Sequence, residues 1–153
     1  MTGLSGAHVE RPSFFTEEEF VMLNTLTELI IPADEHSPGA RAVGVAAYID
    51  RVVAEAFLPE DQLSWRRGLA AVDRFSVSSI QKAFNTASGE EQIILLTQIA
   101  KNEKNPETAA ERFFLQLKQT TAFAYYTSSV GIHREMSYQG NVLLPEFVGY
   151  DAT

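Results

Sequence analysis

Apolar residues recur three and four positions apart along most of this sequence, which is the spacing of one face of an α-helix. The first such segment begins at Thr16 and Glu19, a Ser/Thr-x-x-Glu pattern typical of a capped helix start. Its apolar face carries Phe20, Leu23, Leu26 and Ile30. Because Pro32 disfavours helical backbone at the residue before it, we expect this helix to end near Ile31.

The same spacing predicts further helices over residues 45–57, 59–75, 88–100 and 105–127, with a short one over 78–84. Ser88 and Glu91 repeat the capping pattern, and Asn105 followed by Pro106 favours a start for the last and longest helix. Residues 32–44 read as a loop. The side chains expected on the buried faces are Tyr48, Ile49, Val52, Val53, Ala56, Leu63, Leu69, Val72, Phe75, Ile94, Leu95, Ile99, Phe113, Phe114, Leu117, Thr121, Ala124 and Tyr125.

No segment alternates between apolar and polar residues as a β-strand does, so the predicted class is all-α. With 153 residues we expect one domain, a bundle of about five to six helices with a loop-rich, aromatic C-terminal tail. Residues 1–13 are expected to be a flexible N-terminal lead-in, and residues 14–153 a single helical domain.

Charge and composition exclude several classes of function. Twenty acidic residues against twelve basic ones give a net charge of −8, which disfavours binding to nucleic acid and to anionic membranes. The chain has no cysteine, which excludes disulfides, thiolate metal sites and covalent haem attachment. No apolar run is long enough for a membrane span.

Catalytic signatures are missing from the sequence. It contains no dinucleotide-binding glycine turn, no phosphate-binding loop and no nucleophile elbow. A di-iron bundle needs Glu-x-x-His pairs, and none occurs. Asp34, Glu35 and His36 are neighbours, but such a group in a loop is more often a set of turn formers than a metal site. We therefore expect no catalytic, cofactor-binding or metal-binding residue in this chain.

Aromatic residues concentrate toward the C-terminus. Tyr125 and Tyr126 end the last predicted helix, and Tyr138, Phe147 and Tyr150 follow in a loop-like stretch. Exposed aromatic side chains are typical of the centres of protein interfaces. Rings that cover the core of the bundle itself are an equally good interpretation, and the sequence leaves both open.

Several short motifs stand out when they are taken in order, the most specific being Leu29–Asp34 with Pro38–Ala40, supported by Tyr125–Ser128. In this order they resemble the gluconate 2-dehydrogenase subunit 3 family, the small gamma subunits of bacterial flavin-linked sugar dehydrogenases. The resemblance extends over residues 14–150. The remaining matching motifs are Phe15-Thr16, Gly44-Val45, Tyr48–Asp50, Phe113-Phe114 and Tyr138–Asn141.

This resemblance implies a non-catalytic accessory subunit. Members of the family pair with a large FAD-binding subunit of the glucose–methanol–choline oxidoreductase type, often beside a c-type cytochrome. The FAD and the catalytic groups belong to that partner, and the small subunit assists its folding and maturation in a chaperone-like way. Oxidation of gluconate, glucose or glycosides is compatible with the family. The motif residues that lie in predicted loops or at the last helix end are our candidates for partner binding: Pro32, Asp34, Pro38, Gly39, Tyr125, Tyr126, Tyr138, Gly140 and Asn141.

The expected location and two alternatives complete the interpretation. The family implies a periplasmic protein, yet no twin-arginine export signal precedes Phe14, so a cytoplasmic location is also compatible. The main alternative function is a stand-alone helical protein that binds a ligand or regulates another protein. A second is an enzyme that uses Asp34, His36 and tyrosines.

Overall fold

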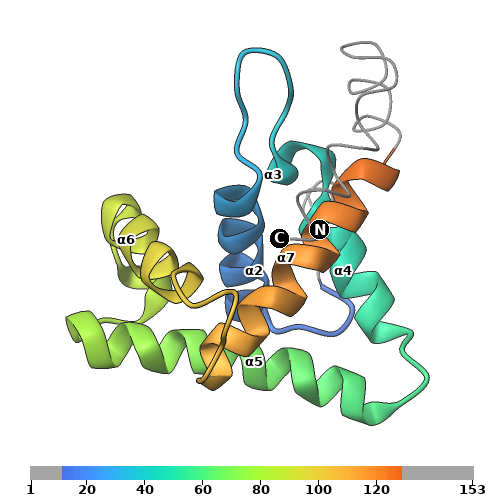
Figure 1. The fold of residues 1–153 in the computed structure, drawn as a ribbon. Coiled ribbons are helices and arrows are strands. Elements are labelled where there is room, and N and C mark those ends of the chain that lie inside the picture. Colours follow the sequence, from blue (N-terminus) through green and yellow to red (C-terminus); the bar gives the residue numbers. More distant parts are fainter. Residues whose placement is uncertain (1–11, 129–153) are drawn as a thin grey trace, which may run out of the picture.

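The computed structural model describes residues 12–128 and confirms the all-α class (Figure 1). Labelled as in Figure 1, the described residues form six α-helices and one 3₁₀ helix, with no strand among them. None of the described helices is long and apolar enough to cross a membrane. The elements are α2 (Glu17–Ile30), α3 (Ala40–Val43), α4 (Val45–Ala54), α5 (Pro59–Ile80), η1 (Phe84–Thr86), α6 (Gly89–Ala100) and α7 (Ala109–Thr127).

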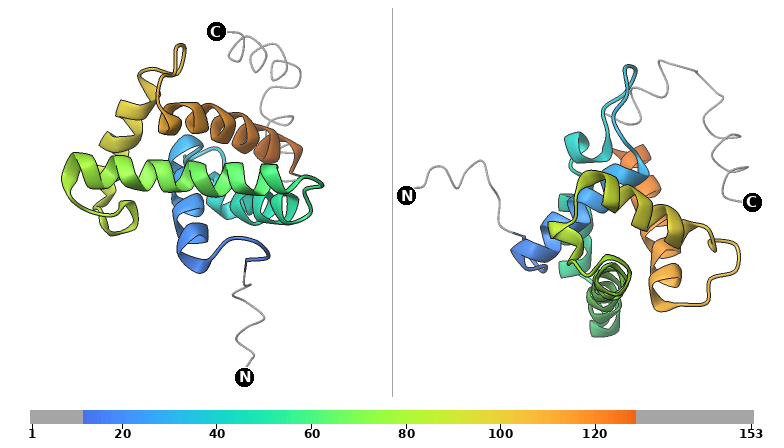
Figure 2. Two further views of the ribbon diagram at one scale, coloured as in Figure 1. Left: turned by 90° about the horizontal axis from the view of Figure 1, so that it is seen from below. Right: turned by 90° about the vertical axis from the view of Figure 1, so that its left-hand side faces the viewer.

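Helix α7 packs against α2, α4, α5 and α6, and α5 runs across one end of the others (Figures 1 and 2). The core forms where these helices meet. Leu23, Leu26, Ile49, Leu69 and Leu117 are among its fully buried side chains. Trp65 of α5 packs edge-to-face on Phe113 of α7, with ring centroids 5.5 Å apart. One continuous core therefore joins helices from both ends of the described chain.

Three helices begin with a complete capping box. The pairs Thr16–Glu19 and Ser88–Glu91 cap α2 and α6, which confirms both predictions. The predicted start of the last helix at Asn105 is wrong. The N-cap of α7 is Thr108. Its hydroxyl accepts a hydrogen bond from the Glu111 amide, and the Glu111 carboxylate accepts one from the Thr108 amide.

The structure corrects other expectations. Helix α5 continues past the predicted end to Ile80, so it is longer than α7, and residues 78–84 form no helix of their own. The Ser76 hydroxyl donates to the Lys82 carbonyl at 2.6 Å and so fixes the turn that follows α5. Val52, Leu63 and Ile94, expected to be buried, are exposed. The buried stripe predicted for α7 is confirmed throughout.

The buried carboxylate of Asp50 on α4 anchors the segment that precedes α2. It accepts the backbone N–H groups of Ser13, Phe14 and Phe15, the last at 3.0 Å. Three consecutive amides have no partner within a helix here, so one carboxylate satisfies donors that burial would otherwise strand. The approach of the chain to α2 is thereby fixed against α4.

Arg66 of α5 holds the same segment from the other side. Its guanidinium makes two bonds to the Glu19 carboxylate, at 2.8 and 2.9 Å. It also donates to the Phe14 carbonyl at 3.1 Å and lies over the Phe14 ring, 4.3 Å from its centroid. Such fork-like pairing is more specific in geometry than a single Lys contact.

The Arg66–Glu19 pair makes part of the free energy of unfolding depend on pH. Partial burial raises the pKa of Glu19, but the hydrogen bond and charge of Arg66 and the bonds with Thr16 outweigh it and lower the pKa below its ordinary value of 4.5. A carboxyl group with a lowered pKa in the folded state stabilises the fold above its unfolded pKa. That contribution is lost as the pH falls through the folded value.

We expect Arg66→Met to lower the free energy of unfolding by about 1 kcal/mol at neutral pH, because the pair is partly exposed. The loss of stability on acidification below about pH 4.5 should be shallower in this variant than in the wild type. Urea denaturation between about pH 3 and pH 7 measures both effects. An Arg66→Met variant with the wild-type acid slope would contradict this role of the pair.

Candidate functional site

A projecting loop between α2 and α3, residues 31–39, forms the first part of the candidate site (Figure 1). Its two ends meet where the Ala40 amide donates to the Ile31 carbonyl at 2.9 Å. The Glu28 carboxylate of α2 bridges them further, accepting the amides of Ala33 at 3.1 Å and Arg41 at 2.8 Å. The base of this exposed loop is thus held by a backbone bond and by the Glu28 carboxylate.

Asp34 shapes the tip of this loop. Its carboxylate accepts the amides of His36 and Ser37, each at 2.8 Å, and its own amide donates to the Ser37 carbonyl. This is the turn-forming use of aspartate that the sequence favoured over a metal site. Within residues 12–128, no three His, Cys, Asp or Glu side chains gather in a way that could hold a metal ion.

Gly39 allows the loop to close tightly on α2. A Cβ atom at this position would collide with the Glu28 carboxylate and would lie 2.6 Å from the Ala33 amide nitrogen. These are the groups that hold the base of the loop, so a larger residue would displace the bridge itself. The need for a residue without a Cβ atom at this position therefore explains the glycine of the Pro-Gly motif.

The second part of the candidate site is the C-terminal end of α7. The Tyr125 hydroxyl donates to the Pro38 carbonyl at 2.6 Å, across 87 positions of sequence. Tyr125 is buried, and the half-buried Tyr126 meets its ring edge-to-face, with centroids 5.3 Å apart. The structure thus joins two motifs that the sequence analysis nominated for partner binding without predicting a contact between them. Tyr125 fits the core interpretation of the aromatic residues, whereas Tyr126 is partly on the surface.

The remaining predicted site residues divide into two groups. Pro32 and Asp34 belong to the same loop, with Pro32 near its base and Asp34 at its tip. Tyr138, Gly140 and Asn141 lie outside the described residues, as does the rest of the predicted aromatic tail.

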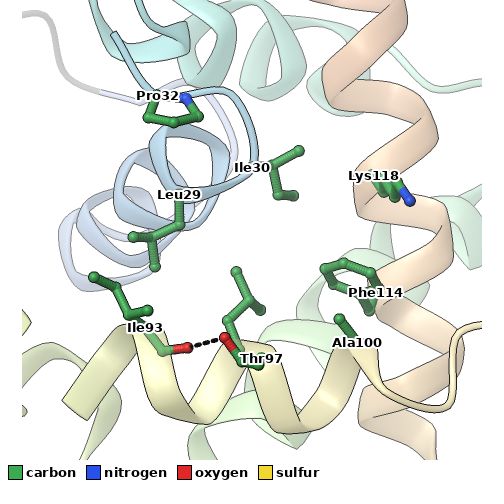
Figure 3. A pocket seen from close by; sticks show the side chains of 9 residues that line it. Leu29, Ile30, Pro32, Ile93, Thr97, Ala100, Phe114 and Lys118 are labelled. Atoms are coloured by element: carbon green, nitrogen blue, oxygen red, sulfur yellow. Dashed lines mark hydrogen bonds between the residues drawn. The ribbon is translucent and has the colours of Figure 1, made fainter. Parts of the chain in front are cut away.

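An apolar groove of about 430 Å³ adjoins the base of the loop, and sequence reasoning missed it (Figure 3). It lies between the end of α2, the exposed side of α6 and the middle of α7. Its polar groups are engaged: Lys118 pairs with Glu103 at 2.6 Å, and the Thr97 hydroxyl donates to the Ile93 carbonyl. The lining residues are Leu29, Ile30, Pro32, Ile93, Leu96, Thr97, Ala100, Phe114 and Lys118.

One signal in the sequence could have located this groove. Helix α6 carries consecutive apolar residues from Ile93 to Leu96, more than one face of a surface helix needs. Leu95 and Leu96 enter the core, whereas Ile94 is 55% exposed and Ile93 lines the groove. The surplus of apolar residues, rather than their period, marks the open surface.

The fold and the site define an all-α protein with a braced loop beside an apolar groove. A family model described as gluconate 2-dehydrogenase subunit 3 matches residues 17–142, and the chain belongs to this family. The match includes the loop and all of α7. No curated protein and no solved structure matches the chain.

Proposed function

We propose that this chain is the non-catalytic small subunit of an FAD-dependent sugar or glycoside dehydrogenase. Membership of the subunit 3 family makes it a subunit of an oxidoreductase complex. In our proposal it binds the large flavoprotein subunit, which holds the FAD and performs the oxidation, and it stabilises or matures that subunit. A c-type cytochrome as a third component and a periplasmic location belong to the same proposal.

The observation that carries this proposal is the bond between Tyr125 and Pro38. It brings together two of the motifs at a partly buried junction, next to the exposed residues of an internally braced loop. The Glu28 bridge and the Asp34 turn fix the loop before any partner arrives. A preorganised surface loses less conformational entropy on binding, which favours a stable subunit contact.

Co-expression with a large FAD-binding dehydrogenase subunit from the same organism tests the function. We expect the two chains to purify together and to catalyse FAD-dependent oxidation of a sugar, with an added redox dye as the electron acceptor. The flavoprotein expressed alone should be insoluble, poor in FAD or inactive. A soluble and fully active flavoprotein that does not bind this chain would overturn the proposal.

Tyr125→Phe tests the candidate site within that complex. The variant keeps the ring but leaves the Pro38 carbonyl without its donor, so we expect a loss of about 1 kcal/mol in the free energy of unfolding. Because the loop then loses its brace, affinity for the flavoprotein should fall roughly fivefold. Tyr48→Phe removes a hydroxyl from α4 and should leave affinity unchanged. Equal affinity for the two variants would separate the loop from partner binding.

The apolar groove favours a second candidate function, a stand-alone protein that binds a small ligand. Its volume and lining are typical of ligand sites. Under this alternative the purified chain binds an apolar ligand as a monomer, and Ala100→Trp, which fills the groove, abolishes that binding. Formation of the flavoprotein complex by Ala100→Trp would assign the groove no part in subunit contact.

A further inference from the structure

The corner between α4 and α5 presents a second apolar surface, which lies at the opposite end of the fold from the projecting loop (Figure 1). Connections between helices usually expose polar residues. Here Phe57 is 94% exposed, and Val52, Leu58 and Leu63 are exposed around the same corner. We call these four residues the corner patch. An exposed phenylalanine surrounded by aliphatic side chains marks a surface for contact with another molecule.

The corner patch is carried by a rigid turn. The Gln62 amide donates to the carbonyls of Val53 and Ala54, at 3.1 and 3.3 Å, and so ties the first turn of α5 to the end of α4. Pro59 opens α5, and the Asp61 amide donates to the Leu58 carbonyl. Because this backbone is already fixed, burying Phe57 in a partner costs little ordering entropy.

Carboxylates flank the turn at the centre of the corner patch. Glu55, Glu60 and Asp61 are all exposed, and the nearest basic residues in sequence, Arg51 and Arg66, lie beyond its two ends. Interfaces place positive potential opposite negative potential. The surface that fits this corner is therefore an apolar pocket with Lys or Arg side chains at its rim.

This charge pattern disfavours two other occupants. A symmetric dimer through the corner would place the patch against itself and bring the carboxylates of both copies together. A membrane carries a negative surface that repels the same groups. A different protein with a basic rim meets neither obstacle.

We propose that the corner patch docks into an apolar, basic-rimmed pocket on the large flavoprotein subunit, with Phe57 as its central residue. The inference rests on the proposed function and adds a contact away from the loop and the end of α7. A central aromatic residue with an outer ring of polar groups is the usual arrangement of an energetically dominant interface contact.

Phe57→Ser in the full-length chain is the first test. Unlabelled variant competes with labelled wild-type chain for the flavoprotein in the purified complex. We expect its affinity to be about 30-fold lower than that of the wild type, the size of a typical dominant contact. Val77→Ser, at the opposite end of α5, removes another exposed apolar side chain and should compete as the wild type does. Helical content and unfolding midpoint should stay unchanged in both, because neither side chain belongs to the core.

Glu55→Lys tests the chemistry of the pocket. Glu55 is the C-cap of α4, where a positive charge is compatible with the helix dipole, so the variant should fold normally. We expect it to associate with the flavoprotein about tenfold more slowly at low salt, with a difference that shrinks as salt is added. Glu107→Lys makes the same charge change before α7 and should associate at nearly the wild-type rate.

The outcomes separate the two proposals. If the unlabelled wild-type chain competes for the flavoprotein and Phe57→Ser competes with the same affinity, the docking proposal is overturned and the accessory function stands. Faster association of Glu55→Lys with the flavoprotein overturns the basic rim of the pocket. If the wild-type chain forms a dimer that Phe57→Ser dissociates, and the variant still binds the flavoprotein normally, the corner patch binds a second copy of this chain instead of the flavoprotein. A wild-type chain that forms no complex with the flavoprotein overturns both proposals.

Discussion

Replacing Asp50 with alanine is expected to lower the free energy of unfolding by about 3 kcal/mol, since hydrogen bonds to a charged group contribute about 1.5–3 kcal/mol each and two of the donors are only partly buried. The three amides of Ser13, Phe14 and Phe15 would lose their shared acceptor. The segment before α2 should then detach from α4. Urea denaturation gives the energy, and hydrogen exchange at those three amides shows the detachment.

Asp73→Ala provides a matched comparison. The Asp73 carboxylate accepts one backbone amide, that of Phe84, at 2.8 Å. Its loss should cost about 1 kcal/mol, and Asp50→Asn, which keeps one acceptor oxygen, should lie between the two alanine variants. Equal losses at Asp50 and Asp73 would show that the number of satisfied amides does not set the cost.

Gly68→Ala is expected to lower the free energy of unfolding by about 2 kcal/mol. A Cβ atom at this position would collide with the Phe113 ring, where α5 and α7 cross. Overpacking of a core costs about 1–3 kcal/mol or more, and the gain in helix propensity returns only about 1 kcal/mol. Phe113 is buried and already packs edge-to-face on Trp65, so the ring has little space into which to move.

Gly89→Ala serves as the control for this crossing. Gly89 begins α6, and a Cβ atom there meets nothing within 4 Å, so the variant should change stability by less than about 0.5 kcal/mol. Adding Phe113→Leu to Gly68→Ala should recover part of the loss. The double variant should then lose less free energy of unfolding than the two single variants lose together. Strict additivity would place the cause of the Gly68 effect elsewhere.

Local patterns predicted the presence of the helices well, but they predicted one helix start and the burial of some side chains less well. The boxes at Thr16 and Ser88 were readable because each involves only four residues. At the start of α7 the prediction favoured Asn105-Pro106 and missed the box at Thr108, where the Glu111 carboxylate accepts bonds from the Thr108 amide and the Asn102 side chain. Val52 and Leu63 fit the apolar period, yet both lie at a corner that no other described element covers.

The membership of the candidate site stays a prediction, and its geometry was not predictable from the sequence. Short motifs nominated Pro38, Gly39 and Tyr125 for partner binding without indicating that they touch. Their junction depends on a hydroxyl and a carbonyl 87 positions apart, which no local pattern encodes. The same limit hid the clamp at Asp50, whose partners lie more than 30 positions away. Long-range polar contacts, unlike helix periods, leave no spacing to read.

The bond between Tyr125 and Pro38 also sets an order in time. At a synthesis rate of about 5–20 residues per second, Pro38 leaves the ribosomal catalytic centre roughly 4–17 s before Tyr125 is added. Until α7 is made, the projecting loop lacks its hydroxyl donor, and a chain truncated before Tyr125 never gains it. The junction is therefore complete only in chains whose translation has passed the end of α7, so a partner that selects it would discriminate against prematurely terminated subunits.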